Sequence, residues 1–152
     1  YESKEEKYLA KFRQCADWAI SMQHADGAWN NFSYIYPEHP YGSMAQGEGA
    51  SLLVRAYKLF DDKKYLEAAE KSINFMLKPL NKGGCTLFDG NHVVLQEYQH
   101  LPVVLNGWIF SWWGLYDYVL VTQDSEVKKI MDESLQTLVE FLPRFSCSYW
   151  SM

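Results

Sequence analysis

The feature that most constrains the fold is an almost uninterrupted apolar run, LPVVLNGWIFSWWGLYDYVLV, at residues 101–121. The run is long enough to span a bilayer, but it contains Asn106, Ser111 and Asp117, and no basic cluster flanks it. A charge at the centre of a membrane helix costs roughly 2.5–3.5 kcal/mol on insertion scales. A helix that is hydrophobic all round is better explained as a central helix surrounded by others. We therefore expect a buried helix over residues 102–121 and no membrane span.

Four further helices are expected around this run, because apolar residues recur every three or four positions. The first covers residues 4–23, and its apolar stripe includes Cys15, which we expect to be buried. Helix capping residues and prolines set the ends of the others. The second helix is expected over residues 43–60. The third should begin at a cap, Asp61 or Asp62, and stop at Pro79, and the last should begin at a cap, Asp124, and stop at Pro143.

The segment NKGGCTLFDGNHVVLQEY, residues 81–98, breaks the helical period. Asp89-Gly90 between two apolar stretches indicates a β-hairpin. A faint repeat, in which Tyr8-Leu9 recurs as Tyr65-Leu66, is typical of arrays of helical hairpins, although its period of about 60 residues is long. We predict an all-α fold: an incomplete α/α toroid of helical hairpins, with a small β-hairpin insertion near 84–96. An irregular helical bundle is the alternative.

The charge of the chain limits its partners. The 152 residues carry a formal net charge of −5 and only three arginines. This argues against nucleic acid and against a heavily sulfated polymer, since the arginine fork suits sulfate and phosphate best. A neutral or moderately acidic ligand fits. The length suits a single domain over residues 1–152, and because the chain opens at Tyr1, we expect it to be a fragment of a longer protein.

The cysteines and histidines show no metal or disulfide pattern. The three cysteines are far apart, with no CxxC, so a disulfide framework is not expected. The four histidines have neither HxxxH nor HExxH spacing, so we expect no bound metal.

Three short segments could carry chemistry. LQEYQH, residues 95–100, places a carboxylate, a phenol and an imidazole at the mouth of the apolar run. It is either a loop leading into a buried helix or an active site, and His100 is interpreted as a bystander. Small residues around Gly47 either pack helices closely or let a ligand approach, with Gln46 and Glu48 aimed at it. At the start of the central helix, Asn106 and Trp108 either belong to the core or face a cleft, where indoles suit sugar rings.

Four motifs together resemble a known family. They are YGSMAQGEGASLLVRAY, EY followed by a proline-containing turn, VLNGWIFSWWGLYDY, and SYW near the end, spanning about residues 27–150. In order and spacing they resemble the C-terminal domain of D-glucuronyl C5-epimerases, the heparan sulfate and heparin biosynthetic family. The resemblance implies an α/α toroid that inverts C5 of a glucuronic acid unit in a polysaccharide, giving iduronic acid. It implies a uronic-acid-containing polysaccharide as partner and no cofactor, and leaves a homodimer open.

The resemblance also implies roles for individual residues. Glu97 and Tyr98 match the family's catalytic glutamate-tyrosine pair, and Tyr149 matches a second functional tyrosine. Removing the C5 hydrogen, which lies α to a carboxylate, creates a dianionic enediolate that needs preorganised donors. Inversion needs a base on one face of the ring and an acid on the other, and tyrosine, with an ordinary pKa of about 10, needs neighbours that lower its pKa before it acts as base. The substrate-binding candidates are Gln46, Asn106, Tyr41 and Trp108.

The sequence departs from the family after Tyr149. Where the animal enzymes have an arginine, this chain has Met152, which removes an obvious partner for the uronate carboxylate. Two alternatives therefore stay open. One is a uronan lyase or glycoside hydrolase on the same scaffold, and the other is a non-catalytic carbohydrate-binding or scaffolding domain.

Overall fold

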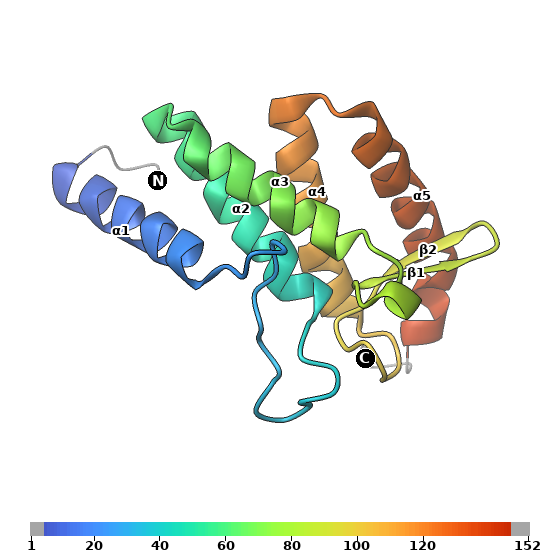
Figure 1. Ribbon diagram of the computed structural model, residues 1–152. Coiled ribbons are helices and arrows are strands. Elements are labelled where there is room, and N and C mark those ends of the chain that lie inside the picture. The colour runs from blue at the N-terminus through green and yellow to red at the C-terminus, as the bar shows by residue number, and fades with distance from the viewer. Residues whose placement is uncertain (1–4, 147–152) are drawn as a thin grey trace.

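The computed structural model describes residues 5–146, and within that part of the chain the predicted all-α class with a small hairpin is confirmed (Figure 1). The ring closure implied by a toroid stays a prediction. The elements are α1 (Glu6–Met22), α2 (Ser43–Phe60), α3 (Lys63–Met76), β1 (Thr86–Asp89), β2 (His92–Leu95), α4 (Leu105–Thr122) and α5 (Ser125–Phe141), with short 3-10 helices at Leu80–Lys82 and Leu142–Phe145.

The centre of the fold is the pair α2 and α4, which begin at the same end and run side by side in the same direction, while α3 and α5 return (Figure 1). Small residues allow this close approach. A Cβ added to Gly114 would lie 2.3 Å from the carbonyl oxygen of Gly47, and one added to Gly47 would lie 2.7 Å from Cα of Ser111. Of the two interpretations of the small residues around Gly47, close helix packing is therefore the one observed.

The helix predicted over residues 4–23 forms as α1, Glu6–Met22, but the prediction was wrong for Cys15, which is exposed. The helix lies at the edge of the molecule (Figure 1) and buries only Ala16 and Ala19. A polar cluster joins it to α3, because the hydroxyl of Tyr65 donates to Asp17 at 2.8 Å. The apolar stripe gave the helical period correctly, but an edge helix has too few neighbours to cover the whole stripe.

Helix α4 is covered on one side only. Trp108 and Leu115 are fully buried, whereas Trp113 on the opposite side is 51% exposed. The expectation of a helix surrounded by others is therefore met on one face of α4. None of the helices within residues 5–146 combines the length and the apolarity needed to cross a membrane.

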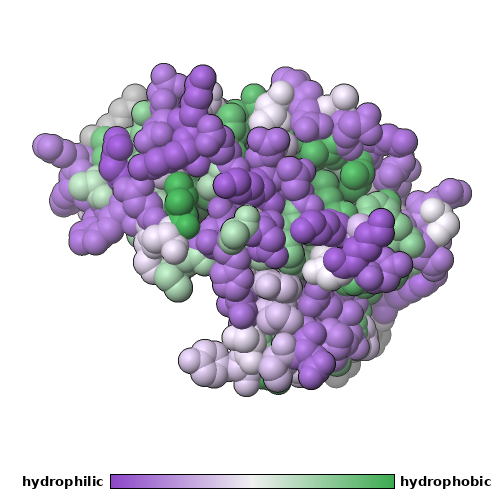
Figure 2. Space-filling model, viewed as in Figure 1, coloured by the Kyte–Doolittle hydropathy of each residue, from purple (hydrophilic) through white to green (hydrophobic). Residues whose placement is uncertain are grey.

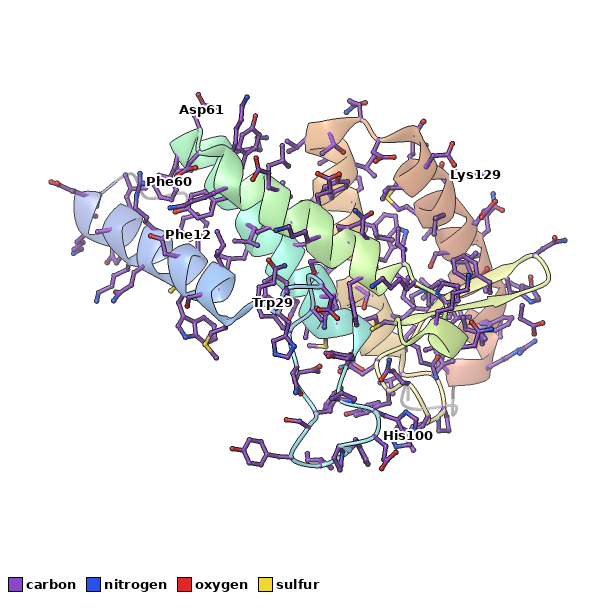
Figure 3. All side chains as sticks on the ribbon, in the orientation of Figure 1. Phe12, Trp29, Phe60, Asp61, His100 and Lys129 are labelled. Carbon is purple, nitrogen blue, oxygen red and sulfur yellow. The ribbon has the colours of Figure 1, made fainter. Side chains whose placement is uncertain are left out.

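The ends of the helices follow the predicted capping residues. Asp62 accepts a hydrogen bond from the backbone N–H of Lys64 at the start of α3, and Asp124 caps the start of α5 in the same way. Helices α2 and α4 each end in a left-handed residue, Asp61 with φ 52° and Gln123 with φ 56°. Asp61 lies at the opposite end of the molecule from His100 (Figure 3), so these tight turns lie away from the LQEYQH segment.

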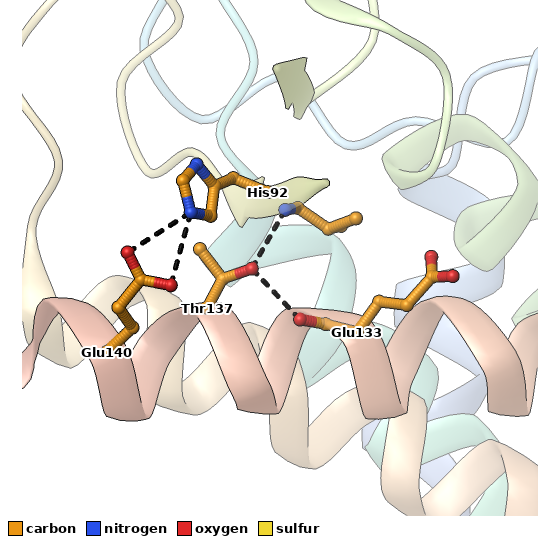
Figure 4. A network of polar contacts seen from close by, with 5 residues as sticks. His92, Glu133, Thr137 and Glu140 are labelled. Atoms are coloured by element: carbon orange, nitrogen blue, oxygen red, sulfur yellow. Dashed lines mark hydrogen bonds and ion pairs between the residues drawn. The ribbon is translucent and has the colours of Figure 1, made fainter. Parts of the chain in front are cut away.

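The β-hairpin forms where the sequence predicted it, with Asp89 paired to His92 and Gly90 in the left-handed region at φ 58°. Side chains of α5 hold it in place. Oγ1 of Thr137 accepts from the backbone N–H of Val93 at 3.0 Å, and His92 Nε2 lies 3.2 Å from the Glu140 carboxylate (Figure 4). Strand β2 is buried almost throughout, and it leads the chain directly into Gln96 and Glu97.

Candidate active site

The segment after β2 passes the starts of α2 and α4. The backbone N–H of Ser43, the first residue of α2, donates to the carbonyl of Gln96 at 3.0 Å. Gly42 approaches the backbone of Glu97 so closely that a Cβ added to Gly42 would lie 2.3 Å from the carbonyl oxygen of Glu97. The Gln96 amide donates to the carbonyl of Leu101 at 2.6 Å. These contacts fix the backbone that carries Glu97 and Tyr98.

Glu97 is buried, with 8% of its surface exposed, and its Oε2 has no hydrogen-bond partner among residues 5–146. Burial raises the pKa of its carboxyl from 4.5 to about 7, and the negative charge of Glu48 adds to the shift. Desolvation acts this way because it disfavours the charged form of an acid. A carboxyl group with a pKa near 7 exchanges protons readily at neutral pH.

Tyr98 is half-buried, and its ring packs against a different part of the fold from the Glu97 carboxylate. Its ring stacks on Phe32, with centroids 4.7 Å apart and planes 28° apart, and meets Tyr36 edge-on at 6.1 Å. Both partners belong to the connection between α1 and α2, whereas the Glu97 carboxylate lies against α4. The two side chains of the predicted catalytic pair therefore pack on different elements, Tyr98 on the α1–α2 connection and Glu97 on α4.

His100 is exposed but belongs to the same group of rings. Its imidazole lies 4.5 Å from the ring of Tyr36 and stacks on His39 at 4.5 Å. The sequence interpretation missed Phe32, Tyr36 and His39. The only signal for them was the aromatic and histidine content of NNFSYIYPEH, which does not indicate that these residues meet LQEYQH.

Two of the substrate-binding candidates, Gln46 and Tyr41, interact with other parts of the chain. Gln46 is fully buried, its Oε1 accepts from the Trp29 N–H at 2.8 Å, and its Nε2 donates to the carbonyls of Trp29 at 2.9 Å and Gly42 at 3.2 Å. Tyr41 is half-buried and meets the Phe75 ring edge-on at 4.8 Å, and burial raises the pKa of its hydroxyl. Gln46 thus ties backbone segments together.

The other two candidates lie on α4. Trp108 is fully buried and donates from Nε1 to Oγ of Ser134 at 2.8 Å, which places its indole in the core. Asn106 is exposed beside Gly107 at the start of the helix. Tyr149 and Met152 lie outside the described residues.

A groove of about 900 Å³ runs between α1, α2 and α4. Its floor contains the exposed rings of Trp113 and Tyr116, and its polar side includes Asp117, which accepts from Arg55 at 2.8 Å. Glu48 also lines the groove. The negative charge of the same residue contributes to the raised pKa of Glu97. Within residues 5–146, no group of three or more His, Cys, Asp or Glu side chains could hold a metal ion.

Fold and site together define a helical domain that presents a buried carboxyl group with a raised pKa, next to a tyrosine, at one end of a parallel helix pair. Over residues 6–152 the sequence matches the family described as "D-glucuronyl C5-epimerase C-terminus", and the chain belongs to this family.

Two relatives match much of the chain, and the first of them carries the name of this family. The chain is 32% identical over 146 residues to "D-glucuronyl C5-epimerase" of Caenorhabditis elegans, a match covering 89% of this chain and 23% of the relative. It is 28% identical over 116 residues to an uncharacterized protein of Methanocaldococcus jannaschii, covering 72% of this chain and 38% of that protein. The chain therefore spans well under half of each relative's length.

Proposed function

We propose that this chain is part of an enzyme that inverts C5 of glucuronic acid units in a polysaccharide. Family membership supports the reaction class. The observation that carries the proposal is Glu97, a buried carboxyl group with an unpaired oxygen and a pKa of about 7, directly preceding Tyr98. Carboxyl groups with strongly perturbed pKa values cluster at functional sites.

The chemistry requires proton transfer at a carbon that is weakly acidic. The C5 hydrogen is removed by a base on one face of the sugar ring, the C6 carboxylate takes up the charge as an enediolate, and a proton returns to C5 from the other face. Tyr98 and Tyr149 are the two groups proposed for these faces. The charge that develops on the enediolate must be met by donors already in place.

Glu97 serves this chemistry in either protonation state. Its ionised form accepts a proton from a phenol, which makes that phenol a base, and its oxygens can also hold a sugar hydroxyl. With a pKa of about 7, both the ionised and the neutral forms are populated near neutral pH. A carboxyl group with its ordinary pKa of 4.5 would be almost entirely ionised there.

The test is hydrogen exchange at C5. The complete protein, incubated with a glucuronic-acid polysaccharide in D2O, should incorporate deuterium at C5, followed by NMR. Tyr98→Phe should abolish the exchange, and Tyr34→Phe, at a fully exposed position in the connection between α1 and α2, should leave it unchanged. The absence of exchange on every uronan tried would overturn the proposal. An unsaturated product that absorbs in the near ultraviolet would instead identify a lyase.

A second candidate, non-catalytic glycan binding, is favoured by the groove between α1, α2 and α4 with its exposed Trp113 and Tyr116. Aromatic rings with nearby polar side chains suit the two-sided surface of a sugar. Trp113→Ala should weaken oligosaccharide binding, whereas Trp18→Ala, an exposed tryptophan that does not line the groove, should not. Binding that survives Tyr98→Phe without any turnover would favour this candidate.

A further inference from the structure

The ring of Tyr98 is enclosed by a loop distant in sequence. Phe32 stacks on it at 4.7 Å, Tyr36 meets it edge-on at 6.1 Å, and the rings of Phe32 and Tyr36 are themselves 6.3 Å apart. Aromatic pairs in such geometries stabilise each other by about 0.5–1.5 kcal/mol beyond the area they bury. The three rings therefore form one packed group rather than a chance contact.

The loop that carries these rings has its own hydrogen bonds. The backbone N–H groups of Asn31 and Phe32 both donate to the carbonyl of Pro40, at 3.2 and 2.9 Å, which closes the loop at its neck. Inside it, the N–H of Tyr36 donates to the carbonyl of Phe32 at 2.7 Å. This bond fixes the spacing between the two rings that contact Tyr98. In Figure 2 the loop projects from the helical body at the lower left.

Both ends of the loop are anchored to the helices. At its start, the Gln46 amide holds both the N–H and the carbonyl of Trp29, and the Trp29 indole donates to the carbonyl of Ala19 at 2.8 Å. Figure 3 shows Trp29 where α1 meets α2. At its end, the N–H of Ser43 donates to the carbonyl of Gln96, one residue before Glu97. The loop is thus fixed relative to the backbone that carries Tyr98.

We propose that Phe32 and Tyr36 are positioning residues for Tyr98, and that Gln46 acts through the loop by anchoring Trp29. The inference rests on the proposed function. A phenol that exchanges a proton with C5 must keep its hydroxyl within hydrogen-bonding reach of that carbon, and rotation of the side chain about its Cα–Cβ bond would remove it. The stack on Phe32 and the edge contact with Tyr36 restrict this rotation. Displacing a reacting group by about 1 Å can slow a reaction about 100-fold.

The experiment compares three variants of the complete protein by C5 exchange. Phe32→Leu keeps an apolar side chain but removes the stack, Phe32→Tyr restores an aromatic ring, and Tyr34→Leu changes an exposed residue of the same loop. We expect kcat to fall by about 10- to 100-fold in Phe32→Leu with little change in KM, and to recover in Phe32→Tyr. Tyr34→Leu should match the unaltered protein. Thermal unfolding followed by circular dichroism checks that all three fold.

The outcomes separate this inference from the proposed function. If the unaltered protein shows no exchange, the proposed function fails and the positioning role fails with it. If the unaltered protein exchanges and folded Phe32→Leu is equally fast, or changes only KM, the positioning role alone is wrong. A folded Phe32→Tyr variant as slow as Phe32→Leu would also overturn it, because the aromatic ring would then not be what matters.

Discussion

The carboxylate of Glu97 lies directly against the backbone of Gly107 in the first turn of α4. A Cβ added to Gly107 would lie 2.2 Å from Oε2 of Glu97 and 2.7 Å from its Cβ. The helix thus presents bare backbone to the carboxylate, and the missing side chain at position 107 leaves the space that Glu97 occupies.

Gly107→Ala is therefore expected to displace the Glu97 side chain. Judged on helix propensity alone, alanine would stabilise this position by up to about 1 kcal/mol, but the contact predicts lost activity instead. With Glu97 in its proposed role, C5 exchange should slow by about 10- to 100-fold, because displacing a reacting group by about 1 Å can slow a reaction about 100-fold. The measurement is the exchange rate of the folded variant. A rate equal to that of the unaltered protein would show that Glu97 moves aside without consequence.

Gly114→Ala is the matched change in the same helix, away from Glu97. Its Cβ would meet the backbone of Gly47 at 2.3–2.6 Å, and rigid backbone cannot move aside as a side-chain tip can. Forcing α2 and α4 apart should lower the free energy of unfolding by about 1–3 kcal/mol, measured by urea denaturation. An unchanged or higher stability would contradict the close packing of these helices.

Glu97→Gln should change how stability depends on pH. The pKa of Glu97 is about 7 in the folded chain, above its ordinary value of 4.5, so protonation favours the folded state. The unaltered protein should therefore lose stability as pH rises from 4.5 to 7.

The glutamine variant lacks this ionisation. Above pH 7 it should be more stable than the unaltered protein by on the order of 1–3 kcal/mol, and below pH 4.5 the difference should be much smaller. Urea denaturation across this range measures it, and a difference independent of pH would contradict the raised pKa.

Glu48→Gln should lower the pKa of Glu97, because the charge of Glu48 is the smaller of the two causes that raise it, after burial. If Glu97 takes part in the reaction as proposed, its pKa of about 7 should produce a limb of the pH–rate profile near pH 7. In Glu48→Gln this limb should move to lower pH but should not disappear, because the burial of Glu97 is unchanged. Glu126→Gln, an exposed change on α5, is the control. A profile that does not move would mean that Glu48 and Glu97 do not interact.

The two described cysteines should differ in reactivity. Cys15 is exposed on α1, whereas Cys85 is fully buried and burial raises the pKa of its thiol to about 12. The thiolate is the reactive form. Iodoacetamide should therefore label Cys15 in the folded protein and Cys85 only after unfolding, as followed by mass spectrometry of the two peptides. Equal labelling rates in the folded state would contradict the burial of Cys85.

The sequence predicted the features that depend on local pattern. Helix α2 begins at Ser43 and ends at Phe60 as expected, and the Asp62 and Asp124 caps form, because spacing and capping are properties of neighbouring residues. The hairpin at Gly90 was predictable for the same reason. These features can be predicted without knowing which residues, distant in sequence, pack against them.

The features that depend on tertiary neighbours could not be predicted. Cys15 lies on an apolar stripe and Trp113 in the apolar run, but both are exposed, since the elements that pack against a helix decide which side of it is covered. Gln46 was expected to face a ligand, yet a loop 17 residues away in sequence takes up its amide. Glu97 was identified by resemblance, but its raised pKa follows from its burial and from the nearby charge of Glu48, both of which depend on the fold.

The left-handed turns after α2 and α4 are suitable positions for labelling this domain. Asp61 and Gln123 are both exposed, and Asp61 lies at the end of the molecule remote from His100 (Figure 3). Once the exposed Cys15 has been replaced, a fluorophore attached to a cysteine at either turn would follow movements of the helical hairpins while staying clear of Glu97 and Tyr98. Glycine, which adopts this backbone geometry without strain, could replace Asp61 to stabilise the domain at a position remote from His100.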